Sequence, residues 1–365
     1  FLHGLYVSET GGGWADLTPG CLLPPDPPSA VPPGMDSEYR FTRKELVAIT
    51  GLDACAVEGI AYDGVLPNRM YVAAYDVTSL RGTEPTIGPG GVYVSDTLGV
   101  SWRKLIGGIR GNGLAVWRDP VRLTATIVVG YIQASNGAVG STPDNGSLMI
   151  SDDDGMTWRS IVLPPSGCAD IVDTSQRITP TVVIDPKDPS KIFAGTNAGL
   201  YASSDGGVTW TLARAACGGV WGIALTPDGS TIYIGDKDGI VSKASVSTLQ
   251  FSPLVDLGAG KIQSLVLDPR DAGRLYAAMW SGADANVYAI SAAGSSKRDD
   301  SLLREVIPLD QTWPAQIPKP FPLAFKSANG AAAPSLFLQV QPALTAVADP
   351  LYVSTIFRGV FVRSE

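Results

Sequence analysis

The feature that most limits the fold of this chain is a repeated unit that ends in a tryptophan. Its clearest copy, residues 178–210, holds three short apolar runs, TVVID, KIFAGT and GLYASS, then the turn DGG and Trp210. Valine, isoleucine, phenylalanine and tyrosine dominate the runs, while glycine, proline and aspartate bound them, which is typical of β-strands joined by turns. Each unit is therefore predicted to form a small sheet of short strands.

The unit recurs along the chain, with copies that begin near residues 57, 111, 178, 219, 262 and 336. The tryptophans that end the three clearest copies, Trp102, Trp158 and Trp210, are 56 and 52 residues apart. A period near 50 residues with about four strands per repeat is typical of β-propeller blades. The sequence therefore predicts an all-β fold, a single propeller of four-stranded antiparallel blades, with seven blades as the first choice and six as the alternative.

The two ends of the chain carry incomplete repeats. Residues 4–14 resemble only the second half of a unit, and the last unit ends on its third strand at the C-terminus. A ring of blades must pair its first and last strands or leave exposed edges. We therefore expect the N-terminal segment to complete the C-terminal blade and close the ring, or to form a partial blade beside it.

Two stretches break the rhythm of the single domain expected over residues 1–365. Residues 15–38 are rich in proline, which cannot donate a hydrogen bond within a sheet, so they predict a long surface loop. Residues 291–334 are expected to form an irregular insertion.

The turn segments resemble the Asp-box motif, Ser-x-Asp-x-Gly-x-Thr-Trp. SDDDGMTW (151–158) and SSDGGVTW (203–210) match every defined position, whereas SDTLGVSW (95–102) has Thr97 in place of the aspartate. The chain thus resembles the BNR/Asp-box repeat propellers, which include sialidases, xyloglucan-active glucanases, sortilin-type receptors and a photosystem II assembly factor. The repeat is most similar to the last three groups.

The resemblance implies a structural role for the boxes. A short aspartate side chain accepts backbone N–H groups and holds a tight turn, glycine supplies backbone freedom, and tryptophan packs between sheets. In the family these boxes lie away from the usual ligand face. The residues assigned this role are Ser95, Gly99, Trp102, Ser151, Asp153, Gly155, Trp158, Ser203, Asp205, Gly207 and Trp210.

The opposite face of a propeller is built by the loops that enter the first strand of each blade and by the loops between the second and third strands. Two of the latter loops, 74–90 and 131–146, are long, and long loops on such a face are often functional. The residues expected to bind a ligand on this face are Tyr75, Arg81, Asn112, Tyr131, Arg177, Trp221, Gln263, Trp280 and Arg358.

Glycoside hydrolysis is the enzymatic alternative, because the same face offers carboxyl groups and the reaction needs two of them across a sugar bond. The candidates for a catalytic role are Glu58, Asp76, Asp236, Asp238 and Asp284. A sialidase should carry an early Phe/Tyr-Arg-Ile-Pro motif, which EYRFTR (38–43) lacks. The xyloglucan-active relatives form their cleft from two propellers, whereas this chain has room for one.

The sequence lacks the signals that are typical of several other classes of function. The only histidine is His3, which argues against Ser-His-Asp catalysis and histidine-rich metal sites, so neither a metal nor a cofactor is expected. The formal net charge is −8 and no basic run occurs, so nucleic acid is not an expected partner. No apolar run reaches the ~18 residues that suggest a membrane span.

The four cysteines, Cys21, Cys55, Cys168 and Cys217, fit disulfides in an oxidising compartment. One of three possible pairings joins Cys168 to Cys217 and Cys21 to Cys55, and four reduced thiols are the alternative. With Phe1 taken as a processed terminus, this indicates a secreted, periplasmic or cell-surface protein. The favoured function is a binding module for a protein or carbohydrate surface, with glycoside hydrolase second and a structural subunit of a surface assembly third.

Overall fold

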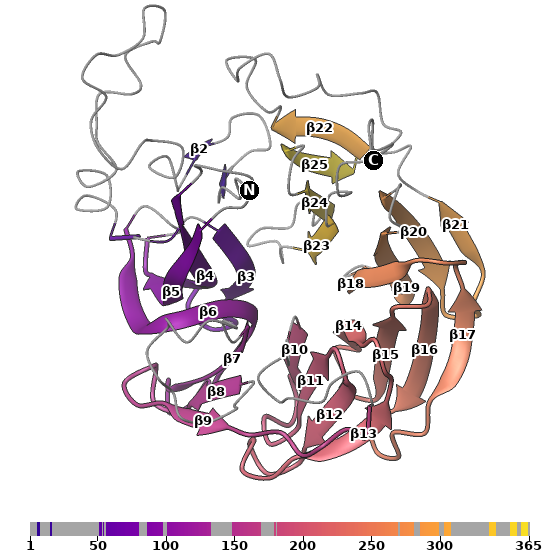
Figure 1. Ribbon diagram of the computed structural model, residues 1–365, viewed down its shortest axis with the longest axis horizontal. Coiled ribbons are helices and arrows are strands. Elements are labelled where there is room, and N and C mark those ends of the chain that lie inside the picture. The colour runs from indigo at the N-terminus through magenta and orange to yellow at the C-terminus, as the bar shows by residue number, and fades with distance from the viewer. Residues whose placement is uncertain are drawn as a thin grey trace, which may run out of the picture. The chain divides into compact units, whose positions relative to one another are not determined.

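The computed structural model describes the chain in segments, and all regular secondary structure within them is β-strand (Figure 1). None of these segments contains a helix long and apolar enough to cross a membrane. The chain divides into two compact units, residues 1–162 with 173–179 and residues 163–172 with 180–365. The described residues are 6–7, 15–16, 51–52, 54, 56–79, 86–97, 101–132, 148–168, 179, 181–268, 271–280, 285–298, 303–307, 336–340, 351–355 and 359–363.

The first unit contains one seven-stranded antiparallel sheet and one two-stranded sheet. The two-stranded sheet pairs β1 (Tyr6–Val7) with β2 (Ala15–Asp16). The strands of the larger sheet, in spatial order, are β3 (Ala56–Tyr62), β4 (Met70–Ser79), β5 (Thr86–Ser95), β6 (Arg103–Arg118), β7 (Ala125–Ile132), β8 (Leu148–Ser151) and β9 (Arg159–Ile161).

The long strand β6 explains why two repeats share one sheet. Its first part, from Arg103 to Ile109, pairs with β5, and its second part, from Arg110 to Arg118, pairs with β7. Gly108, one residue before the end of the first part, has a φ of 80°, a conformation that glycine adopts without strain. The seven strands are therefore two four-stranded arrays that share β6, and they correspond to the repeats that begin near residues 57 and 111.

The second unit contains four sheets of four antiparallel strands. In three of them the first strand lies beside the first strand of the next, β10 (Thr181–Ile184) beside β14 (Val220–Leu225) and β14 beside β18 (Lys261–Asp268), and β18 lies beside β23 (Leu336–Val340) of the fourth sheet (Figure 1). Three sheets follow chain order: β10 (Thr181–Ile184), β11 (Ile192–Thr196), β12 (Gly199–Ser203), β13 (Thr211–Ala215); β14 (Val220–Leu225), β15 (Thr231–Asp236), β16 (Ile240–Ser245), β17 (Ser252–Asp256); and β18 (Lys261–Asp268), β19 (Asp271–Trp280), β20 (Ala285–Ser291), β21 (Ser296–Arg298).

The fourth sheet is ordered β22 (Leu303–Ile307), β25 (Gly359–Arg363), β24 (Leu351–Thr355), β23 (Leu336–Val340). The C-terminal repeat does end on its third strand, β25, as predicted. Its fourth strand, however, is β22 from earlier in the same unit and not the N-terminal segment, because β25 pairs with β22 while β1 pairs with β2. The stretch 291–334, expected to be irregular, supplies both β21 and β22.

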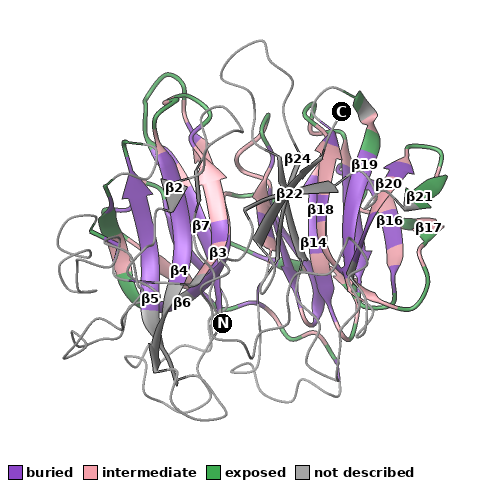
Figure 2. Ribbon diagram, turned by 90° about the horizontal axis from the view of Figure 1, so that it is seen from above, coloured by how far each residue is buried: buried purple, intermediate pink, exposed green. Residues whose placement is uncertain are grey.

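The core lies between neighbouring sheets, and Figure 2 shows buried residues along the strands with exposed residues at the turns. In the second unit, Phe193 and Leu200 of one sheet pack with Val220 and Ile232 of the next. Small residues permit this close approach, because a Cβ atom at Gly235 would collide with Ile262 of the adjacent sheet. Sheets that are apolar on both faces are stabilised by stacking, as the blades of a propeller are.

The two complete Asp boxes have the same internal hydrogen bonds. The Ser151 hydroxyl accepts the backbone N–H of Gly155 at 2.8 Å, and Asp153 accepts the Thr157 backbone N–H at 2.8 Å and its hydroxyl at 2.6 Å. The Trp158 indole donates to the Gly155 carbonyl at 3.0 Å. Ser203, Asp205, Gly207, Thr209 and Trp210 repeat this arrangement, with distances of 2.8, 2.8, 2.6 and 3.1 Å.

The box at 95–102 shows how threonine replaces the missing aspartate. The Thr97 hydroxyl accepts the backbone N–H of Ser101 at 2.9 Å and lies 3.2 Å from the Ser95 hydroxyl. A neutral hydroxyl thus closes the turn that a carboxylate closes elsewhere.

A buried arginine links the turns of the first unit. Arg118, at the end of β6, contacts Asp63 at 2.6 Å, the Tyr71 hydroxyl at 2.9 Å and Asp154 at 2.7 Å, and it also donates to the Leu123 carbonyl. The side chains of Arg118 and Asp63 are 1% and 0% exposed. These contacts tie the turn after β3 to the turn after β6 and to an Asp box.

Acid should weaken the Asp boxes. The hydroxyl and backbone N–H of Thr157 lower the pKa of Asp153 to about 2, and those of Thr209 lower the pKa of Asp205 to about 2. A depressed carboxyl pKa stabilises the fold above the ordinary value near 4, and this contribution is lost as the pH falls toward 2. In urea unfolding, Asp153→Asn with Asp205→Asn should therefore cost stability at pH 7 and progressively less below pH 4. A stability difference between the wild type and the double variant that is equally large at pH 7 and pH 2.5 would contradict this.

Loss of Arg118 should leave a buried, uncompensated carboxylate. We expect Arg118→Met to lower the free energy of unfolding by about 3–5 kcal/mol, because Asp63 would lose its ion-pair partner. Arg122→Met is the matched control: its side chain is 82% exposed, and we expect a change within about 0.5 kcal/mol. Equal effects of the two substitutions in urea unfolding would show that the buried contacts do not hold the turns.

Candidate ligand-binding site

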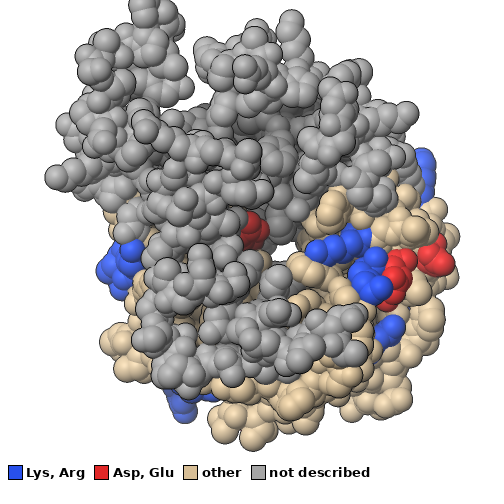
Figure 3. All heavy atoms as spheres, viewed as in Figure 1, with Lys and Arg blue, Asp and Glu red and all other residues tan. Residues whose placement is uncertain are grey.

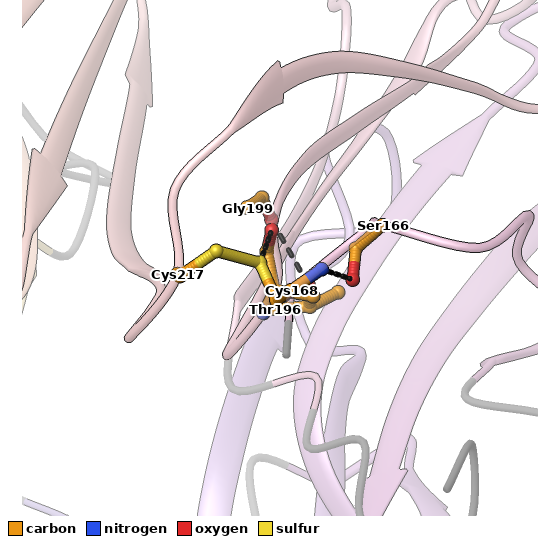
Figure 4. Close-up of a disulfide and its surroundings, with 6 residues drawn as sticks. Ser166, Cys168, Thr196, Gly199 and Cys217 are labelled. Carbon is orange, nitrogen blue, oxygen red and sulfur yellow. Dashed lines mark hydrogen bonds between the residues drawn. A yellow bond between two sulfur atoms is a disulfide. The ribbon is translucent and has the colours of Figure 1, made fainter. Parts of the chain in front are cut away.

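A disulfide holds one end of the second unit. Cys168 and Cys217, the cysteines paired in one of the sequence alternatives, are bonded with their Cα atoms 5.5 Å apart (Figure 4). Cys168 is buried, and its backbone N–H donates to the Ser166 hydroxyl at 3.2 Å. The bond anchors the loop that enters β14 to the segment before β10, across the turn between β11 and β12, where the Thr196 hydroxyl donates to the Gly199 carbonyl at 3.0 Å.

The disulfide loop continues into Gly218 and Gly219, which place Trp221. Both glycines have positive φ values, 103° and 106°. A Cβ atom at Gly218 would collide with the Lys237 side chain, and one at Gly219 would collide with the Trp221 indole. The Trp221 Nε1–H instead folds back to donate to the Gly218 carbonyl at 3.0 Å. The glycine pair therefore lets two turns and an indole ring lie in close contact.

Lys261 lies over the face of the Trp221 ring. It is the first residue of β18, and its register partner on β19 is Trp280. Directly opposed residues of antiparallel strands present neighbouring side chains on the same face of a sheet. The Lys261 amine thus lies over one indole, on the neighbouring sheet, and the lysine side chain stems from the position opposite a second indole, on its own sheet. We call Trp221, Lys261 and Trp280 the Trp–Lys–Trp cluster.

The cluster has two unusual polar groups. Burial disfavours the charged form of Lys261 and lowers its pKa to about 8. The Trp280 indole nitrogen is buried and has no hydrogen-bond partner within the described segments. Perturbed titration and uncompensated donors are features that mark functional sites more often than ordinary surface.

The carboxylates near this end are engaged in local structure. Asp236, which is buried, accepts the backbone N–H groups of Asp238 and Ile240, both at 3.0 Å, and so holds the turn between β15 and β16. Asp238 is exposed and lies 3.1 Å from the Lys237 amine. The structure therefore places these two sequence candidates in the turn between β15 and β16.

In the first unit, several of the residues that were expected on the ligand face are buried or half-buried. Asn112 in β6 is 7% exposed and Tyr131 near the end of β7 is 3% exposed, whereas Glu58 in β3 is half-buried. Tyr75 and Asp76 belong to β4, since β4 and β5 extend well into the stretch 74–90 that was expected to be a loop. In the second unit Gln263 is half-buried in β18.

The remaining predicted residues fall outside the described segments: Arg81, Arg177, Asp284, Arg358, Gly99, Cys21 and Cys55. Within the described segments no three His, Cys, Asp or Glu side chains are close enough together to hold a metal ion. In Figure 3 the coloured basic and acidic side chains lie interspersed, and they form no broad area of one sign among the residues drawn in colour.

Sequence reasoning identified the two tryptophans of the cluster but missed Lys261. The signal was the strand-entry sequence AGKIQ, in which a lysine is the first residue of the strand. Its meaning depends on the register that sets Lys261 opposite Trp280 and on the packing of the neighbouring sheet, neither of which a single sequence shows.

The comparisons with known proteins agree with the fold. No family model and no curated protein matches the sequence. Among solved structures, an ancestral GH74 enzyme is similar with a TM-score of 0.53 and 15% identity, over 86% of this chain and 45% of that one. The GH74 xyloglucanase from Xanthomonas campestris is similar with a TM-score of 0.55 and 16% identity, over 85% and 45%.

This chain thus spans about half the length of both enzymes, 45% in each case. At these identities the likeness concerns the fold alone. Together with the repeated four-stranded sheets, it shows that the chain has a β-propeller fold.

The lowered pKa of Lys261 is directly measurable. After reductive methylation with ¹³C-formaldehyde, one lysine resonance should titrate near pH 8, because burial penalises the charged amine. The same resonance should vanish from the spectrum of Lys261→Arg, which assigns it. A Lys261 signal that titrates at the ordinary value near 10.5 would show that the amine is fully hydrated.

Proposed function

We propose that this propeller is a secreted or cell-surface binding module, and that it holds a carbohydrate partner at the Trp–Lys–Trp cluster. The observation that carries the proposal is one amine that lies over the face of the half-buried Trp221 indole, with a second half-buried indole, Trp280, at the strand position opposite this lysine. Both lie at the end of the sheets opposite the Asp box of the second unit. Indole rings offer large apolar faces for sugar rings and dominate the energetics of many binding surfaces.

The loop that carries Trp221 is already restrained in the free protein, which favours binding. The Cys168–Cys217 bond, the positive-φ glycine pair and the hydrogen bond from the Trp221 indole together restrict the loop that carries this ring. Groups fixed in this way lose little conformational entropy when a ligand binds. The same disulfide supports an oxidising, extracytoplasmic location.

Carbohydrate is favoured over a protein partner by the fold relatives. The GH74 neighbour from Xanthomonas campestris is a xyloglucanase, so a related scaffold handles a polysaccharide. Hydrolysis is the second candidate for the same reason. It has less support from the site, since Asp236 and Asp238 are engaged in a turn and a lysine contact.

Binding should depend on the two tryptophans. We expect Trp221→Ala and Trp280→Ala each to weaken retention of a bound oligosaccharide by roughly 30-fold, or about 2 kcal/mol, as truncation of a central aromatic anchor does. The ligand is chosen from a glycan array that includes xyloglucan oligosaccharides, and affinity is measured by calorimetry. Val208→Ala is the control, because this exposed side chain lies in an Asp box at the other end of the sheets.

Two results would contradict the proposal. Unchanged affinity in both tryptophan variants, each with a native urea midpoint, would place the contact surface elsewhere. Release of new reducing ends from xyloglucan by the wild-type protein would replace a binding role with hydrolysis.

A further inference from the structure

The ammonium of Lys261 has an incomplete set of partners. Within the described segments its one ring interaction is with the face of Trp221, and no carboxylate or hydrogen-bond acceptor reaches Nζ. Its neighbour Lys237 differs, since that amine is paired with Asp238 at 3.1 Å. This end of the unit therefore carries one lysine with an anion and one without.

A single aromatic face compensates only part of the cost of removing an ammonium from water. The group also carries three N–H donors, and an indole face accepts poorly compared with a carboxylate. Lys261 thus has capacity left for an anion, and the burial that lowers its pKa would strengthen such a pair once formed.

The surroundings restrict what kind of anion fits. The chain has a net charge of −8, which disfavours a densely charged polyanion but not a polysaccharide with isolated carboxylates. One unpaired ammonium over an apolar indole face suits a single carboxylate attached to a ring with an apolar face. The dense phosphates of a nucleic acid need a broad basic surface, and the basic side chains drawn in Figure 3 form no broad area.

We propose that Lys261 receives the carboxylate of an acidic polysaccharide, with a uronic-acid ring held against Trp221 and Trp280. This inference rests on the proposed carbohydrate-binding function and specifies its ligand class. No covalent step is involved: the carboxylate pairs with the ammonium, and the sugar ring displaces water from the indoles.

The test uses an array of uronic-acid oligosaccharides, each printed beside its carboxyl-reduced, neutral counterpart. We expect the wild-type protein to bind at least one acidic oligosaccharide, and to bind its reduced counterpart at least about 10-fold more weakly. Equal binding to acidic and reduced forms, or binding to neutral glycans alone, would overturn the assignment to Lys261.

Two lysine variants test whether acidic binding depends on Lys261 itself. Lys261→Gln should bring acidic binding down to the level of the reduced glycan, whereas Lys237→Gln should stay within about twofold of wild type because its amine already has an anion. Equal losses in both variants would indicate general charge attraction and would overturn the proposal.

A measurement of stability distinguishes an amine that binds a ligand from an amine that supports the fold. Lys261→Met should keep or raise the urea midpoint, because it removes a desolvated charge and retains an unbranched apolar stem. A lower midpoint would show that the amine supports the fold and would overturn the proposal. If Lys261 proves irrelevant while the tryptophan variants still lose a neutral glycan, the binding function stands; if those variants lose nothing, the function itself fails.

Discussion

The structure depends on the burial of both faces of its sheets. Central strands such as β11, β12 and β15 are buried at nearly every residue, so a sheet on its own would expose apolar side chains to water on both sides. Stacking against a neighbour removes this surface from water, and repeated stacking explains why one unit of sequence recurs along the chain. Glycines such as Gly235 allow the sheets to approach closely where a side chain would block contact.

The turns at the two ends of the sheets differ in how their polar groups are paired. At one end, the two complete Asp boxes pair the polar groups of their turns, as the Arg118 contacts do in the first unit, whereas the indole nitrogen of Trp102 in the third box is buried without a partner among the described residues. At the other end, the disulfide loop and the Trp–Lys–Trp cluster leave an indole nitrogen and an amine with unused hydrogen-bonding capacity. A turn that satisfies itself stabilises the fold, whereas a site with spare capacity is available to a partner.

Local signals in the sequence were sufficient for most of the strands and for the boxes, although β4 and β5 extend into the stretch 74–90 that was expected to be a loop. The Ser-x-Asp-x-Gly-x-Thr-Trp turns act within eight residues, so their hydrogen bonds follow from order along the chain. Three features depended on distant partners and could not be predicted: β22 completing the last sheet, Arg118 reaching Asp63, and Lys261 opposing Trp280. Each is set by packing or register between segments far apart in the sequence.

The central claim is that the end opposite the boxes is where a partner binds. The most direct measurement is a titration of ¹⁵N-tryptophan-labelled protein with an acidic oligosaccharide selected on the array, followed through the indole N–H resonances. We expect the signals of Trp221 and Trp280 to shift, while those of Trp102, Trp158 and Trp210 in the boxes do not. Shifts confined to the box tryptophans would contradict it.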